Sequence, residues 1–183
     1  ISCAGFFVPG EVMTPREVRN GPVAEALLLL PAKMTSPQAE LMLLAIGLQE
    51  SELKHRRQHG NGPARSLWQA EQGGGMVAGL LGFHNQDVQD LARGLCAVRG
   101  VPAQPRAVWE EIEHDDVLAA GLARLLLFTD PARLPGLGDE EGAWQLYLRT
   151  WRPGAFTRGT AAKRAELRQK WAKNYAQALE VVR

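Results

Sequence analysis

The segment from residue 36 to residue 53 most constrains the fold, because it is apolar on nearly every side of a helix. Ser36 is a suitable N-cap and Pro37 a suitable first helical residue, so we expect a helix from there to about Leu53. Its apolar residues are Ala39, Leu41, Met42, Leu43, Leu44, Ala45, Ile46, Leu48 and Leu53. A helix that is apolar all round needs neighbours on every side, so this pattern predicts a buried central helix.

Helix caps and breakers separate most of the remaining segments. Asn85 predicts a helix to about Arg99, and Asp115 or Asp116 predicts a second buried helix up to residue 128. Further helices are expected over about 22–30, 76–83, 105–114, 141–151 and 160–181. Since no apolar alternation of any length occurs, we expect a mainly α fold, with at most a small β-hairpin within residues 54–70.

The length of 183 residues fits one domain over residues 1–183, in which residues 1–20 form an irregular lead-in with a short helix after Thr14 and Pro15. The net charge of +1 argues against a nucleic-acid partner, because no strong overall field attracts phosphates. Residues 160–183 carry a local basic bias. This bias indicates either the solvated face of a terminal helix or contact with an anionic surface such as a cell-wall polymer.

Several classes of site find no support in the sequence. Cys3 and Cys96 do not form a disulfide framework, and Cys96 has the surroundings of a small core residue. The histidines His55, His59, His84 and His114 are scattered, so we expect no metal site and no cofactor. The apolar runs are too short for a membrane span, and the first ten residues lack the basic start of a signal peptide. No Ser-His-Asp set and no phosphate-binding loop is recognisable.

Glu50 is the first candidate for chemistry. On the expected helix it shares a face with Leu43, Ile46 and Leu53, so the face that enters the core carries one carboxylate. Burial raises the pKa of a carboxyl, and a general acid at neutral pH has to hold its proton until it donates it. The alternative is an ion pair between Glu50 and Lys54 at the end of the helix.

The second candidate is the segment from Ser66 to Glu71, which includes Trp68 and Gln69. A wide aromatic side chain stacks on sugar rings, and an amide both donates and accepts hydrogen bonds. The alternative is that Trp68 fills the core and Gln69 faces solvent.

The third candidate is the aromatic face formed by Trp144, Tyr147 and Trp151, with Arg149 and Arg152 nearby. Core packing would use most of this face. Tyr147 could instead direct its hydroxyl into a cleft, since a buried tyrosine hydroxyl normally finds a partner.

Together, these motifs resemble those of the lytic transglycosylases with a lysozyme-like fold and of the goose-type lysozymes. In that family an apolar helix ends in Glu-Ser, a Gly-Leu-Met-Gln-like motif follows, and a Tyr-Asn-Ala-Gly-like motif precedes the terminal helices. Glu50 and Ser51 match the first motif, and residues 66–69 (SLWQ) are similar to the second, with Ser66 in place of Gly and Trp68 in place of Met. Residues 149–154 (RTWRPG) keep only a trace of the third. Residues 122–131 (LARLLLFTDP) and 147–154 (YLRTWRPG) are also similar to small proteins of bacteriophage and prophage genomes.

The resemblance implies a lysozyme-like helical domain that cleaves the bond between N-acetylmuramic acid and N-acetylglucosamine in peptidoglycan. It implies Glu50 as the catalytic acid and base, and it implies substrate contacts by Ser51, Ser66, Trp68, Gln69, Glu71 and Tyr147. Hydrolysis with two carboxylates needs a partner about 5 to 9.5 Å away, for which Glu71 is the candidate. Glu52 is not a candidate, because two residues along a helix it points elsewhere.

Three functions therefore remain open. The first is a lytic transglycosylase or muramidase that acts at the bacterial cell wall, in the periplasm or after delivery with a virion. The second is a non-catalytic glycan-binding protein, or a phage virion component that contacts other virion proteins. The third is a helical structural or nucleic-acid-associated protein, against which the small net charge speaks.

Overall fold

The computed structural model describes residues 12–183, and this part of the chain is mainly helical, as the sequence predicts. The helices are α1 (Pro15–Val18), α2 (Ala24–Leu28), α3 (Pro37–Ser51), α4 (Gln86–Val98), α5 (Pro105–Glu111), α6 (Asp116–Phe128), α7 (Glu140–Trp151), α8 (Gly154–Thr157) and α9 (Ala161–Val182). Short π-helical segments (Arg19–Val23 and Gly75–Gly79) and short 3-10 segments (Ala32–Met34 and His59–Asn61) lie between them.

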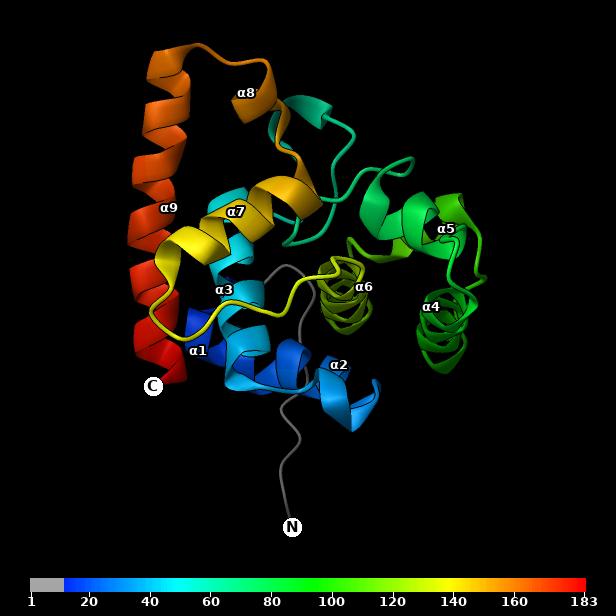
Figure 1. Ribbon diagram of the computed structural model, residues 1–183. Helices are drawn as coiled ribbons and strands as arrows, with labels where there is room; N and C mark the ends of the chain where they lie inside the picture. The colour runs from blue at the N-terminus through cyan, green and yellow to red at the C-terminus, as the bar shows by residue number, and fades with distance from the viewer. Residues whose placement is uncertain (1–11) are drawn as a thin grey trace.

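The helix α3 lies at the centre of the molecule, as its all-round apolar character predicts (Figure 1). The C-terminal helix α9 packs along it in the opposite direction. At one end, Arg19 bridges the two helices, since it donates to Glu40 Oε2 of α3 and to the Val181 carbonyl of α9. At the other end, Asn174 Nδ2 donates to Gln49 Oε1.

The second buried helix, α6, passes beside α3, and α4 packs against its other side (Figure 1). The close contact between α4 and α6 needs Gly121, because a Cβ there would lie 2.8 Å from Leu95 Cδ1. Cys96 is buried next to this contact as a free thiol, as expected for a small core residue. Cys3 lies outside the described residues.

Side-chain caps begin these helices where the sequence places them. Ser36 Oγ accepts from Ala39 N, Asn85 Oδ1 accepts from Asp87 N, and Asp115 Oδ1 accepts from Leu118 N. One helix start differs from the prediction. The chain is helical from Pro15, after Thr14 and Glu17 form a capping box, and it passes through Pro22 in a π-type turn instead of beginning there.

The segment between α3 and the glycine-rich turn (residues 73–75) is irregular. Within residues 12–183 no strand forms. In the region where the sequence predicts at most a small β-hairpin, there are two isolated antiparallel bridges, Arg57 to Arg65 and Arg65 to Ala70. Two arginines of this segment form ion pairs with carboxylates at or near the helices α5 and α6. Arg56 forms a buried ion pair with Asp116 at 2.6 Å, and Arg57 pairs with Glu113 at 2.8 Å.

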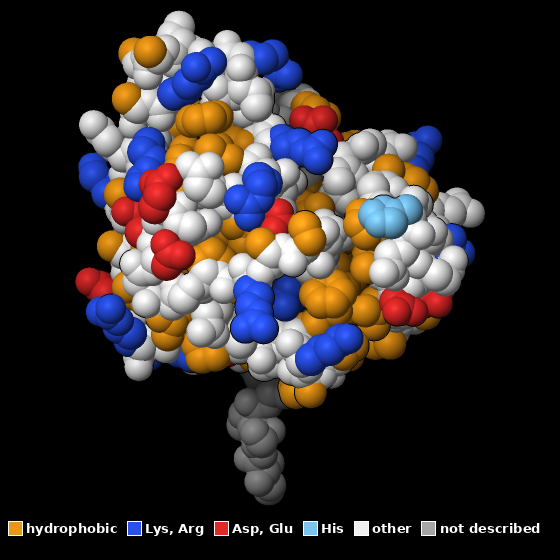
Figure 2. Space-filling model, viewed as in Figure 1, with side chains coloured by type: hydrophobic (Ala, Val, Ile, Leu, Met, Phe, Trp, Pro, Cys, Tyr) orange, Lys and Arg blue, Asp and Glu red, His pale blue; other side chains and the backbone are white. Residues whose placement is uncertain are grey.

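The surface of the described residues carries charges of both signs. Figure 2 shows Lys and Arg side chains interspersed with Asp and Glu on the face drawn, with hydrophobic side chains between them. None of the helices within residues 12–183 combines the length and the apolarity that crossing a membrane requires.

Candidate active site

The C-terminal end of α3 carries the strongest candidate, Glu50. The helix ends at Ser51, earlier than predicted, because Glu52 and Leu53 both adopt left-handed backbone conformations with φ of 56°. This turn directs Leu53 back into the core, where it is fully buried over Gly47. The end of the helix is therefore fixed by packing, and Glu50 occupies its last turn.

Tyr147 of α7 holds the carboxyl of Glu50. Its hydroxyl donates a hydrogen bond of 2.6 Å to Glu50 Oε1, and its ring stacks on Trp171 of α9 with centroids 4.9 Å apart. The alternative pairing of Glu50 with Lys54 is not found, since Lys54 Nζ lies 3.6 Å from Glu52 Oε2 instead. The carboxyl thus has a neutral donor from a different helix as its partner.

Burial raises the pKa of Glu50 above its ordinary value. Two weaker effects oppose this rise: the hydrogen bond from Tyr147 and the positive charge of Lys170, both of which favour the carboxylate. Lys170 comes from α9, where its Nζ donates to the Gln49 carbonyl at 2.7 Å. Burial and the charge of Glu50 raise the pKa of Tyr147, so its hydroxyl remains a donor.

Glu50 opens into a cleft of about 770 Å³. One wall comes from the segment after α3 and the glycine turn, including Glu52, His55, Gln69, Glu71 and Met76. The other wall comes from the end of α7, from α8 and from α9, including Thr150, Trp151, Arg152, Pro153, Ala155, Arg158 and Lys170. A second hollow of about 860 Å³ continues from it past Leu126, and Gly74, Gly75, Thr150, Trp151 and Arg152 line both.

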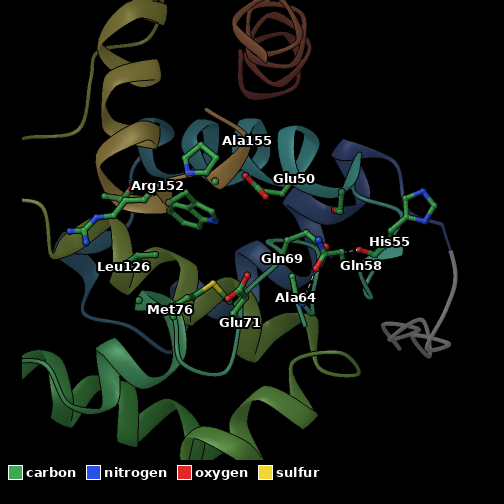
Figure 3. A pocket seen from close by; sticks show the side chains of 18 of the residues that line it. Glu50, His55, Gln58, Ala64, Gln69, Glu71, Met76, Leu126, Arg152 and Ala155 are labelled. Atoms are coloured by element: carbon green, nitrogen blue, oxygen red, sulfur yellow. Dashed lines mark hydrogen bonds between the residues drawn. The ribbon is translucent and has the colours of Figure 1, made fainter. Parts of the chain in front are cut away.

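The predicted site residues divide into those that line the cleft and those that support its walls. Gln69 and Glu71 line the cleft, and Figure 3 shows Glu71 across from Glu50. The Gln69 amide donates to the carbonyl groups of His55 and Ser66, at 2.9 Å and 2.8 Å, so it also holds the wall together.

Four predicted contact residues face inward instead. Ser66 and Trp68 are fully buried behind the wall, and Trp68 Nε1 donates to the Leu43 carbonyl of α3 at 2.9 Å. Ser51 borders the cleft, but its hydroxyl lies 2.6 Å from the Leu67 carbonyl and anchors that segment to α3. Tyr147 is buried behind Glu50 and reaches the cleft only through that carboxyl.

Glu52 differs from the expectation in its backbone, because α3 ends at Ser51 and Glu52 adopts a left-handed conformation instead of continuing the helix. It lies among the residues that line the cleft. Its side chain remains exposed, as does that of Glu71. Within residues 12–183, the carboxylates that line the cleft are therefore Glu50, Glu52 and Glu71, and burial raises the pKa of Glu50.

The sequence analysis did not identify Lys170 or Arg158 as site residues, and it named Arg152 only as a neighbour of the aromatic face. Arg152 belongs to residues 149–154 (RTWRPG), which keep only a trace of the third family motif. In the structure, its left-handed φ of 49° before Pro153 turns the chain from α7 into α8. Lys170 belongs to the basic segment 160–183, but nothing in the sequence distinguishes it from the other cations there, because only the antiparallel packing of α9 on α3 brings it to Glu50. Among residues 12–183, no group of three or more His, Cys, Asp or Glu side chains is placed to hold a metal ion.

Comparison with known proteins adds no relative: no protein-family model, no curated protein and no solved structure matches this chain.

Proposed function

We propose that the chain is a peptidoglycan-cleaving glycosidase in which Glu50 is the general acid and then the general base. The observation that carries the proposal is the setting of Glu50, a carboxyl with a raised pKa that opens into a cleft and is held by Tyr147. To protonate a glycosidic oxygen, an acid must border an open cleft and must still carry its proton near neutral pH, which a raised pKa makes possible.

The reaction begins when Glu50 transfers its proton to the oxygen between N-acetylmuramic acid and N-acetylglucosamine. The bond from the muramyl C1 to that oxygen breaks, and the leaving sugar departs as an alcohol with the proton. Glu50 is then a carboxylate, which the Tyr147 hydrogen bond and the nearby charge of Lys170 stabilise.

The second half of the reaction restores the acid. The carboxylate of Glu50 takes the proton of the muramyl 6-hydroxyl while that oxygen bonds to C1, which gives an anhydro sugar and regenerates the carboxylic acid. One carboxyl suffices for this route because the substrate supplies the nucleophile. We favour this route over hydrolysis, because the side chains of Glu52 and Glu71 are exposed, whereas the carboxyl of Glu50 is held by Tyr147.

The test is digestion of purified peptidoglycan by the wild-type chain and by Glu50→Gln, followed by mass spectrometry of the released sugars. We expect muropeptides lighter than the hydrolysis products by one water from the wild type, and none from the variant. Full release by Glu50→Gln would sink the proposal. Binding to cell walls without release by either chain would instead identify a non-catalytic glycan-binding protein or virion component.

A further inference from the structure

Three cationic side chains of the cleft form no ion pair with another described residue. Arg57 at the opposite wall pairs with Glu113, and Arg149 near the cleft pairs with Asp130. Within residues 12–183, by contrast, no ion pair includes Arg152, Arg158 or Lys170, although all three line the cleft. An anion that enters the cleft can therefore interact with these charges without displacing a carboxylate of the protein.

The charges are separated across the cleft. The unpaired cations come from the wall made by residues 150–158 and by α9, whereas Glu52 and Glu71 belong to the facing wall. Figure 3 shows Ala155 close to Glu50, with Glu71 on the far side of the cleft. A glycan strand with negative groups on one side would therefore bind with those groups toward the cationic wall.

The turn between α7 and α8 brings the residues of the cationic wall to the cleft. Arg152 caps α7 in the left-handed conformation, with its Nε 3.2 Å from the Arg149 carbonyl, so the backbone reverses before Pro153. Arg152 also borders the second hollow, at the point where the two hollows join. Lys170 of α9 belongs to the same cleft lining and lies close enough to Glu50 to lower its pKa.

We infer that Arg152 and Arg158, with Lys170, form a subsite for a carboxylate that the muramyl residue carries beside the cleaved bond. N-acetylmuramic acid has a lactyl group that ends in a carboxylate, either free or extended by a peptide whose own carboxylates follow. N-acetylglucosamine polymers lack this group. Guanidinium groups form paired hydrogen bonds with carboxylates, so the subsite would select acidic glycans over neutral ones of equal length.

The inference rests on the proposed glycan-cleaving function, so the test measures binding instead of cleavage. The background is Glu50→Gln, which keeps the cleft and prevents turnover. The ligands are a peptide-free muramyl oligosaccharide with its free lactyl carboxylate, the same oligosaccharide with that carboxylate converted to an amide, a peptide-bearing fragment, and a chitin oligosaccharide of equal length. Arg152→Gln and Arg158→Gln are added singly and together, and Arg133→Gln is the control that removes an exposed charge outside the cleft lining.

We expect the carboxylated oligosaccharide to bind roughly tenfold tighter than its amide, and the double variant to lose that difference, as for one charge-assisted hydrogen bond. Arg133→Gln should keep the difference, and the chitin oligosaccharide should bind equally to all variants. Whether the peptide-bearing fragment matches the free carboxylate or the amide identifies which carboxylate is recognised.

Two results would overturn the inference in distinguishable ways. Equal binding of the carboxylate and the amide removes the subsite but leaves the proposed glycosidase intact. Failure of every oligosaccharide to bind removes the subsite together with the proposed function.

Discussion

Tyr147 donates a hydrogen bond of 2.6 Å to Glu50, and this bond connects α7 to the end of α3 across 97 residues of sequence. The donor is itself positioned by its stacking on Trp171 of α9. Glu50 therefore depends on three helices: one supplies the carboxyl, one supplies the donor, and one holds the donor in place.

Replacement of Glu50 by Gln should leave the protein at least as stable as the wild type at neutral pH. The pKa of Glu50 is raised in the folded state, so the folded protein binds more protons than the unfolded chain between the two pKa values. Stability therefore falls as pH rises from about 4.3, the usual pKa of Glu, through the folded-state pKa. Thermal melts at several pH values should show the advantage of Glu50→Gln growing across this window. An advantage that is largest at low pH would contradict the assignment.

Replacement of Tyr147 by Phe should raise the pKa of Glu50 further. The ring and its stacking remain, but the carboxylate loses a hydrogen bond worth about 1.5 to 3 kcal/mol. The alkaline limb of the kcat/KM profile should then move to higher pH. Tyr175→Phe is the matched control, because Tyr175, the other of the two tyrosines, accepts its hydrogen bond from Gly138 N. A profile that moves equally in both variants would show that Tyr147 acts through folding alone.

Gly47→Ala should destabilise the protein by about 1 to 3 kcal/mol through overpacking. A Cβ at this position would lie 2.3 Å from Leu53 Cδ2, and Leu53 is fully buried and has little room to move. Chemical denaturation measures the effect. Gly94→Ala on α4 is the control, since nothing lies within 4 Å of its added Cβ, and it should be neutral or stabilising.

Ser51→Ala should cost about 1 to 3 kcal/mol in unfolding free energy while leaving the KM for glycan within twofold. The Ser51 hydroxyl is the donor to the buried Leu67 carbonyl, which would lose its partner. Paired measurements of denaturation and of steady-state kinetics distinguish this from substrate binding. A raised KM with unchanged stability would restore Ser51 as a substrate contact.

Glu71→Gln should leave release of anhydro product within about threefold, because the muramyl hydroxyl supplies the nucleophile. In a hydrolysis with two carboxylates, the same change would remove a base, which typically contributes about 100-fold or more. Quantitative mass spectrometry of both products decides between the routes, with Glu52→Gln as the second cleft carboxylate for comparison. Loss of all products in Glu71→Gln would make Glu71 the catalytic partner of Glu50.

The main helices could be predicted from the sequence because their signals are local. Asn85 and Asp115 cap their helices through their own side chains, and the unbroken apolar character of residues 41–48 required a central position. These features depend on a few neighbouring residues and on water exclusion, both of which a sequence displays directly.

The end of α3 could not be predicted in the same way. Glu52 and Leu53 adopt left-handed conformations although neither is Gly or Asn, the residues that usually mark such a turn. The burial of Leu53 over Gly47 compensates for that backbone cost, and burial is a tertiary effect. The same limit applies to Trp68, whose ring suits a sugar surface and a protein core equally well.

The antiparallel packing of α3 and α9 makes the acid strength of Glu50 a matter of helix register. One helical turn is about 5.4 Å, so a shift of α9 by one turn would exchange Lys170 for a residue four positions away. In one direction that residue is the acidic Glu166, and in the other it is the neutral Asn174. Either exchange removes the positive charge that favours the carboxylate, and the first replaces it with a negative one. The register of α9 against α3 therefore influences the pKa of Glu50.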